Sequence, residues 1–235
     1  MATTTTTKPI ELEITSDTVC PFCYVGYRRI RQAIREVESD PSLSPPPHFT
    51  LRFAPFQLDP TLPLSPGENK LERYERRFGG KEKVDAMVKA MYERGLDLQP
   101  PVKFSYGGNV SNTKDSHRLI EKAWNLGGQE AQLKIVEALF ALYFEHEGDI
   151  GSHEALADVA DKSGIKGLSK AETLEFLKGD ELKDEMEKGF AKAQMRGISG
   201  VPFTIINQQF GVSGAQETET FKEVFRKLAK GELQA

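Results

Sequence analysis

Hydrophobic and polar residues alternate near the start of the chain and then adopt a longer period. Ile10, Leu12 and Ile14 are separated by polar residues, which predicts a strand over residues 9–15. A helical period of apolar residues follows, and a second strand is predicted around residues 48–53. A strand, a helix and a strand in this order imply a parallel pair joined by a right-handed crossover.

The middle of the chain carries helical patterning almost without interruption. Helices are predicted over residues 67–78, 81–94, 113–126, 129–147, 152–163, 170–177 and 180–196. Gly127 and Gly128 separate two of these helices. Residues 133–144 are apolar nearly all round, which predicts a position at the centre of a helical bundle. Trp124 is predicted to lie in the core.

The chain returns to strands after Gly200. Two short apolar runs predict an antiparallel pair over residues 202–206 and 210–212, and an amphipathic helix over residues 218–228 closes the chain. The fold class is therefore α/β, with a β-α-β unit and a β-β-α unit separated by a large inserted α-helical subdomain. The α/β domain is assigned to residues 9–60 and 198–235, and the helical subdomain to residues 61–197.

Composition and charge exclude several classes of protein. The 235 residues carry a formal net charge of -4, so the basic excess of a nucleic-acid-binding protein is missing. No apolar stretch approaches the roughly 18 residues that would cross a membrane. Residues 1–8 lack the basic and apolar regions of a secretory signal, so we expect a disordered leader and a cytoplasmic location. The sequence does not indicate an oligomeric state.

The only two cysteines stand three positions apart, in the motif Cys20-Pro21-Phe22-Cys23 between the first strand and the first helix. Proline suits the first helical position, which makes Cys20 the N-cap residue. Its sulfur is then expected to face the free N–H groups of Phe22 and Cys23, and the helix dipole favours the thiolate, which is the nucleophile. Cys23, one turn further on, is placed to resolve a mixed disulfide.

Two other interpretations of the cysteine pair were weighed. A zinc site needs two more ligands, and the chain has no second cysteine pair, so we expect no metal. A pair of inert buried cysteines is the plainer alternative. Against it, a C-P-x-C motif at a strand-to-helix junction is a specific combination.

The chain resembles a known family at several motifs. Cys20-Pro21-Phe22-Cys23, followed far downstream by Gly200-Val201-Pro202, resembles the thioredoxin fold, and the large helical insertion resembles its DsbA-type branch. Within that branch the chain is similar to the FrnE-like proteins, neighbours of kappa-class glutathione transferases and 2-hydroxychromene-2-carboxylate isomerases. The motifs that carry this likeness are "SDTVCPFCYVG", "GNVSNTKDSHRL" and "GVSGAQ". The resemblance covers about residues 9–230, but the second cysteine pair of some FrnE-like proteins is missing, which excludes a relay through it.

The resemblance implies roles for residues far from the dithiol. Val201-Pro202 would have a cis peptide bond facing Cys20, with Pro202 in the catalytic site and with Val201 and Phe22 contacting the substrate. An ordinary proline at a strand start is the alternative. In glutathione-binding relatives the region of Gly214, Ala215 and Gln216 contacts the γ-glutamyl end, although a plain turn explains these residues equally well.

The helix predicted from residue 113 contributes the last candidates. Asn112 is a candidate N-cap, and the resemblance implies that Asn112, Thr113 and His117 face the dithiol as substrate-binding residues. A surface or packing role for His117 is the alternative. Residues 72–83 mix both charge signs and are interpreted as a solvated helix face.

These features predict a thiol–disulfide oxidoreductase of the DsbA-like type. Its partners would be disulfide-containing proteins or low-molecular-weight disulfides, with no tightly bound cofactor and with glutathione as a candidate co-substrate. One rival is a glutathione-dependent transferase or isomerase, against which the retained Cys23 counts. The other is a redox-inert binding module that keeps the fold for protein contacts.

Overall fold

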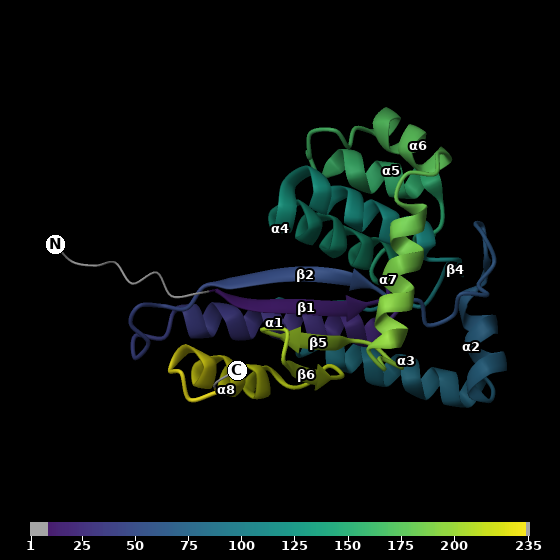
Figure 1. Ribbon diagram of the computed structural model, residues 1–235. Coiled ribbons are helices and arrows are strands. Elements are labelled where there is room, and N and C mark those ends of the chain that lie inside the picture. The colour runs from purple at the N-terminus through teal and green to yellow at the C-terminus, as the bar shows by residue number, and fades with distance from the viewer. Residues whose placement is uncertain (1–8, 234–235) are drawn as a thin grey trace.

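The computed structural model describes residues 9–233, and a four-stranded sheet is its central element (Figure 1). The strands are β1 (Ile10–Ser16), β2 (Phe49–Pro55), β5 (Phe203–Ile206) and β6 (Phe210–Ser213). Their order is β2-β1-β5-β6, with β1 parallel to β2 and the other pairs antiparallel. Two helices, α1 (Pro21–Glu38) and α8 (Thr218–Ala229), pack against each other. These β-α-β and β-β-α units are the predicted ones, and the predicted leader over residues 1–8 lies outside the described residues.

The insertion between β2 and β5 is mostly helical. Its elements are β3 (Glu68–Asn69), α2 (Lys70–Phe78), α3 (Lys81–Leu96), β4 (Asn109–Val110), α4 (Lys114–Phe144), α5 (His153–Lys162), α6 (Lys170–Lys178) and α7 (Lys183–Met195). The prediction that a helix starts at residue 67 is wrong, because β3 pairs with β4 there. The Asn69 side chain accepts a hydrogen bond from the Glu72 N–H at 3.0 Å and thereby sets the start of α2.

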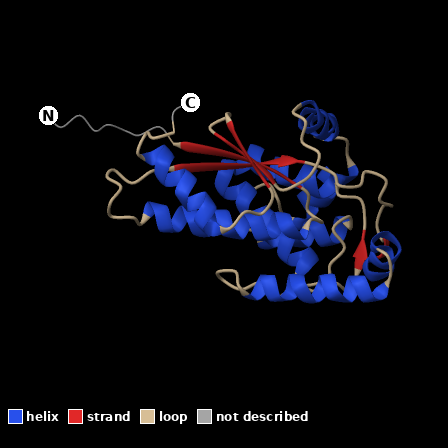
Figure 2. Cartoon of the chain, turned by 90° about the horizontal axis from the view of Figure 1, so that it is seen from below, coloured by secondary structure: helices blue, strands red, loops and turns tan. Residues whose placement is uncertain are grey.

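The alternation in β1 directs one side of the strand into the core. Ile10, Leu12 and Ile14 are buried, whereas Glu11 and Glu13 between them are half-buried. Figure 2, the view from below, shows the strands of the four-stranded sheet gathered in one layer, with helices making up most of the molecule. The carboxyl end of β1 leads directly to the start of α1, and this junction carries the cysteines.

Helix α4 changes direction in the middle and joins the two parts of the molecule. Gly127 and Gly128 have non-helical backbone angles, as their predicted role as a break requires. Helix α4 packs against α5, α6 and α7, as its predicted place in a bundle requires, and its second half packs on the α/β unit as well. The Phe140 ring stacks on Tyr24 of α1 with 4.9 Å between ring centroids, and Gln132 accepts the Phe53 N–H of β2 at 2.7 Å. The buried core is thus shared, and the domain division near residues 60 and 197 stays a prediction.

Trp124 is not a core residue, contrary to the prediction. It is half-buried, and the Arg52 guanidinium of β2 lies over its ring, 4.4 Å from the centroid. Arg52 also pairs with Glu121 at 2.7 Å. The indole therefore covers the polar side of the sheet, where a ring that stacks on a cation is favourable.

Candidate active site around the dithiol

The two cysteines lie where β1 leads into α1. Cys20 is the N-cap residue of α1, with an extended backbone (φ -91°, ψ 111°), and Pro21 is at the start of the helix, as predicted. Both thiols are free. Cys20 is 3% exposed and borders a surface cavity, whereas Cys23 is 0% exposed and does not border it. One sulfur therefore lies at the cavity and the other lies behind it.

The Cys20 sulfur does not cap the helix in the predicted way. No side-chain capping hydrogen bond forms at this residue, and the Cys23 N–H donates to the Cys20 carbonyl oxygen at 3.0 Å. The Cys20 thiol instead donates to the Val201 carbonyl oxygen, with 3.6 Å between sulfur and oxygen. A neutral thiol is only a weak acceptor, so donation to a carbonyl suits it better than capping an amide.

Burial determines the protonation of Cys23. Its complete burial raises the pKa of the Cys23 thiol well above the ordinary value, and the neighbouring Cys20 raises that pKa further. The Ser16 hydroxyl and the Asp17 backbone act in the opposite direction and have smaller effects on this pKa. Cys23 therefore keeps its proton at neutral pH.

The loop before β5 faces the dithiol. The Val201–Pro202 peptide bond is cis, and Val201 borders the same cavity as Cys20. Pro202 lies against α1 at Gly26, where an added Cβ would come within 3.1 Å of the Pro202 Cγ atom. Glycine at position 26 therefore allows the loop and the helix to approach closely beside the cysteines.

A cavity of about 410 Å³ opens beside Cys20 and is mostly apolar. Its walls come from the start of α1, the segment after β2, helices α2 and α3, strand β4 and the loop before β5. The lining residues are Val19, Cys20, Pro21, Phe22, Leu58, Asp59, Leu62, Arg73, Tyr74, Arg77, Phe78, Met87, Val88, Met91, Tyr106, Val110 and Val201. Three of the predicted site residues, Cys20, Phe22 and Val201, meet in this cavity.

The α2 and α3 wall is the part of the site that sequence reasoning missed. Residues 72–83 were expected to be a solvated face, but Arg73, Tyr74, Arg77 and Phe78 line the cavity. The pairs 73/77 and 74/78 are each one helical turn apart, so they share a side of α2. Aromatic residues repeated at this spacing within a charged helix are the signal that could have indicated a buried face.

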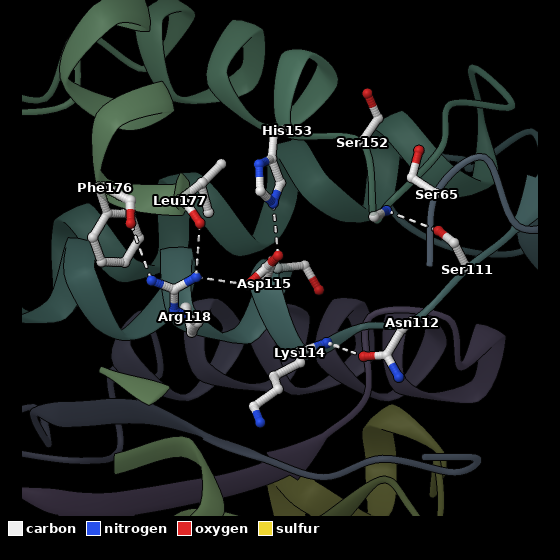
Figure 3. Close-up of polar contacts among 12 residues, drawn as sticks. Ser65, Ser111, Asn112, Lys114, Asp115, Arg118, Ser152, His153, Phe176 and Leu177 are labelled. Atoms are coloured by element: carbon white, nitrogen blue, oxygen red, sulfur yellow. Dashed lines mark hydrogen bonds and ion pairs between the residues drawn. The ribbon is translucent and has the colours of Figure 1, made fainter. Parts of the chain in front are cut away.

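Asn112 and Thr113 hold the segment after β2 rather than line the cavity. The Asn112 amide donates to the Pro60 carbonyl at 3.1 Å, and its oxygen accepts the Lys114 N–H at 3.0 Å (Figure 3). The N-cap position of α4 is Thr113 and not Asn112, and the Thr113 hydroxyl accepts from the Gln57 side chain at 3.3 Å. Both residues thus position the segment that supplies Leu58 and Leu62 to the cavity.

His117 is buried and faces a buried carboxylate. It is 3% exposed, and its Nε2 atom lies 2.9 Å from the Phe56 carbonyl oxygen and 3.4 Å from Asp17 Oδ1. Asp17 is 0% exposed; its Oδ2 accepts the Leu58 N–H at 2.8 Å, and its main-chain oxygen accepts the Cys20 N–H at 3.1 Å. Its Oδ1 has no hydrogen bond within residues 9–233. His117 and Asp17 therefore connect α4 to the segment that carries the dithiol.

The turn over residues 214–216 lies outside the cavity. The Gly214 N–H donates to the Pro202 carbonyl at 2.9 Å, so this amide is already used inside the protein. The Gln216 side chain donates to the Ser213 carbonyl at 2.7 Å, and Arg29 donates to the Ala215 carbonyl at 2.7 Å. These contacts hold the turn on the loop before β5 and on α1.

Arg118 holds the other side of the insertion together (Figure 3). It is 0% exposed, and all five of its N–H donors are used. One bonds Asp115 Oδ1 at 2.7 Å, and Asp115 Oδ2 lies 2.7 Å from His153 Nε2. The other four donate to the carbonyl oxygens of Phe176, Leu177, Gly179 and Glu181. A single side chain thus ties α4 to α5 and to the end of α6.

Two negative findings concern the part of the chain that the structure describes. Residues 9–233 contain no group of three or more His, Cys, Asp or Glu side chains that could hold a metal ion. None of the helices in this range is long and apolar enough to cross a membrane.

Comparison with known families gives the class of the protein. The model of the DSBA-like thioredoxin domain family matches residues 11–226, a range that includes the sheet, the dithiol and the whole insertion. The chain belongs to the DSBA-like thioredoxin domain family. The predicted family and fold class, a thioredoxin fold with a helical insertion, are confirmed.

Individual relatives agree with this family. A probable DsbA oxidoreductase from Streptomyces coelicolor is 25% identical, with a TM-score of 0.78 over 96% of this chain and 92% of that chain. A 2-hydroxychromene-2-carboxylate isomerase, 14% identical with a TM-score of 0.67 over 96% of this chain and all of that chain, shares the fold. The uncharacterised protein YwbO of Bacillus subtilis (strain 168) is 22% identical over 220 residues, which are 91% of this chain and 94% of YwbO.

Proposed function

We propose that the protein is a thiol–disulfide oxidoreductase in which Cys20 attacks and Cys23 resolves. The observation that carries the proposal is the unequal access of the two buried thiols, because Cys20 borders the cavity and Cys23 does not. A sulfur at a cavity can meet a substrate disulfide. A protected neighbour reacts only after a mixed disulfide has formed beside it.

The chemistry needs two exchange steps. The Cys20 thiolate attacks one sulfur of the substrate disulfide, and the other substrate sulfur leaves as a thiolate and takes up a proton. Cys23 then loses its proton and attacks the Cys20 sulfur, which releases the second substrate thiol and leaves a Cys20–Cys23 disulfide. Two electrons have passed from the dithiol to the substrate. The reverse sequence oxidises a substrate dithiol with the same groups.

The substrate binds beside Cys20 in the cavity and along Val201. Its disulfide belongs to a protein segment or to a small thiol such as glutathione, which would act as a co-substrate and not as a resident cofactor. Phe22, Leu58, Phe78 and Met87 are among the exposed large hydrophobic side chains, and all four line the cavity. An apolar group next to the substrate sulfur is therefore favoured. With only two cysteines in the chain, we place this reaction in the cytoplasm, where such a pair is more often catalytic than structural.

Two serine variants test the roles of the cysteines. Cys20→Ser should abolish reduction of a small disulfide, whereas Cys23→Ser should accumulate mixed disulfides on Cys20 because the resolving sulfur is missing. Mass spectrometry of the trapped adducts measures both outcomes. The assignment is wrong if Cys20→Ser accumulates the adducts instead.

One observation favours a second function, a glutathione-dependent transferase or isomerase. The apolar cavity of about 410 Å³ beside Cys20 would accommodate an apolar second substrate next to glutathione. Titration with reduced and oxidised glutathione separates the two functions. A reversible two-electron couple supports the oxidoreductase, and glutathione-dependent turnover without such a couple supports the rival. A protein with neither activity would be a redox-inert binding module.

A further inference from the structure

Three guanidinium groups on α2 share two carboxylates near the cavity. Arg73 is 20% exposed and pairs with both Asp59 and Glu68, so its charge is well compensated. Arg76 also pairs with Glu68 but does not line the cavity. Arg77 does line the cavity and is 52% exposed. Among the described residues its one ion pair is with Asp59 at 3.2 Å, through the oxygen that Arg73 also binds. Arg77 is therefore the cavity-lining cation of this group whose charge is least compensated by carboxylates.

A second cation, Arg94, does not itself line the cavity but lies over Phe22, which does. The Arg94 guanidinium of α3 is 5.3 Å from the centre of the Phe22 ring, between the two cysteines in the sequence. Within residues 9–233 Arg94 has no ion pair. Burial raises the pKa of the cavity-lining Tyr106, a Cys20 charge raises it further and the Arg94 charge lowers it. Arg94 and Cys20 thus both act on Tyr106, and Tyr106 and Cys20 both line the cavity.

The helix start after the 214–216 turn lies outside the cavity and offers no comparable cation among the described residues. Glu217 is the N-cap residue of α8 and Glu219 is in the first turn, so acidic groups occupy the helix start that follows the 214–216 turn. The cations there are already paired: Arg29 with Glu217 at 2.7 Å, and Lys222 and Arg226 with Glu219. A ligand carboxylate in the cavity is therefore attracted by Arg77 and Arg94 rather than by the cations near this turn.

We propose that Arg77 and Arg94 select disulfide substrates that carry a carboxylate close to an apolar group beside the reacting sulfur. The proposal rests on the oxidoreductase function argued above. Arg77 lines the cavity and Arg94 lies over a ring that lines it, so both guanidiniums attract an anion bound there. An acidic protein segment around a cysteine and a small acidic disulfide such as oxidised glutathione both have this chemistry.

Matched peptide disulfides test the selection. Each peptide carries one cysteine and one leucine, has Glu, Gln or Lys as the variable neighbour, and is joined to the same neutral thiopyridine leaving group. The rate at which the reduced protein releases thiopyridine is measured at low and at high salt. We expect the Glu peptide to react about tenfold faster than the Lys peptide at low salt, and the ratio to shrink as salt screens the charges.

Arginine variants locate the source of that ratio. Arg77→Gln and Arg94→Gln should each lower the Glu-to-Lys rate ratio, and the double variant should bring it close to one. Arg77→Lys should retain most of the ratio, because the charge is kept. Arg76→Gln is the control, since Arg76 lies on the same helix outside the cavity, and its ratio should match the wild type.

The outcomes separate this inference from the proposed function. Wild-type protein that reacts with all three peptides at equal rates overturns the charge selection and leaves the oxidoreductase intact. Protein that reacts with none of them, and with no neutral small disulfide, overturns the proposed function itself. Oxidised glutathione and a two-chain Glu peptide disulfide are then compared as substrates, to distinguish a small acidic disulfide from an acidic protein segment. The preferred substrate is the one that reacts faster with the wild type and loses more rate in the double variant.

Discussion

The α4 side and the α2 side of the insertion each contain a buried cation, but the two cations differ in how completely their hydrogen bonds are satisfied. Arg118, under the α4 side, is 0% exposed and has an acceptor for every donor, including the Asp115 carboxylate. Lys70, at the start of α2 on the cavity side, is 1% exposed. Within the described part of the chain its ammonium has one acceptor, the Tyr143 carbonyl at 3.2 Å, and it lies 3.8 Å from the centre of the Tyr143 ring.

This difference separates a side that only holds the structure from a side that also lines the cavity. A buried charge is tolerated at low cost only when its hydrogen bonds are complete. The α4 side meets that condition, and it contributes no residue to the cavity. The α2 side does not meet it, and it exposes Phe78 and Arg77 at the cavity. We therefore expect the two sides to respond in opposite ways when their cations are removed.

The largest expected effect is the loss of Arg118. Arg118→Met should lower the free energy of unfolding by about 3–5 kcal/mol, because four carbonyls and the Asp115 carboxylate lose their donor in a buried place. Urea denaturation measures the change. Arg77→Met on the cavity wall is the matched control and should stay within about 0.5 kcal/mol of the wild type. Equal losses for the two variants would contradict the contrast between the two sides.

The next largest effect concerns the two cysteines, of which Cys20 borders the cavity and Cys23 does not. Near pH 8, alkylation of Cys23 in Cys20→Ser should be about a hundredfold slower than alkylation of Cys20 in Cys23→Ser, because burial hides Cys23 and raises its pKa. The Cys23 rate should still be rising above pH 9.0, the ordinary value from which its pKa is raised. Timed iodoacetamide labelling measures both rates. A Cys23 rate that levels off below that pH would show that Cys23 is not sealed from solvent.

Removing Lys70 should stabilise the protein. Burial lowers the pKa of Lys70 from 10.5 to about 8, so Lys70→Met should raise the free energy of unfolding by about 2 kcal/mol at neutral pH. From about pH 8 to 10.5 the folded wild type releases this proton while the unfolded chain keeps it, so wild-type stability rises and the variant loses its advantage. Urea denaturation at about pH 8 and at about pH 10.5 measures the difference in the free energy of unfolding between variant and wild type. The exposed Lys81→Met variant is the control. A destabilised Lys70→Met at neutral pH would mean that the Tyr143 contacts outweigh the cost of burial.

The smallest effect distinguishes a positioning role from a binding role for Asn112. Asn112→Ala should cost about 1 kcal/mol of stability, because the Lys114 N–H and the Pro60 carbonyl lose their partner. KM for a small disulfide should change little, since Asn112 does not border the cavity. Asn125→Ala, an exposed asparagine on the same helix, is the control for stability. A large rise in KM without a loss of stability would restore the substrate contact predicted from the sequence.

Local features of the sequence determined the framework of the site. The alternation around Ile14 defines β1, and the fixed φ of Pro21 defines the start of α1. Together they put Cys20 at the N-cap and Cys23 inside the first turn. These are interactions between residues close in the chain, so the pattern of a short segment contains the information. The solvent exposure of the two sulfurs could be predicted from this segment only in part, because Cys23 is buried by core residues from other parts of the chain.

The tertiary structure alone decided which distant side chains complete the site. Tyr74 and Arg77 occupy α2 positions that look solvated in the sequence, and they reach the cavity because β3 pairs with β4 and brings α2 beside Cys20. His117 and Arg118 are neighbours in the chain, yet His117 faces Asp17 and Arg118 faces the end of α6. A helix turns by about 100° per residue, so adjacent side chains face different neighbours. Which neighbour each one meets depends on packing between elements, and that information is not contained in any single segment.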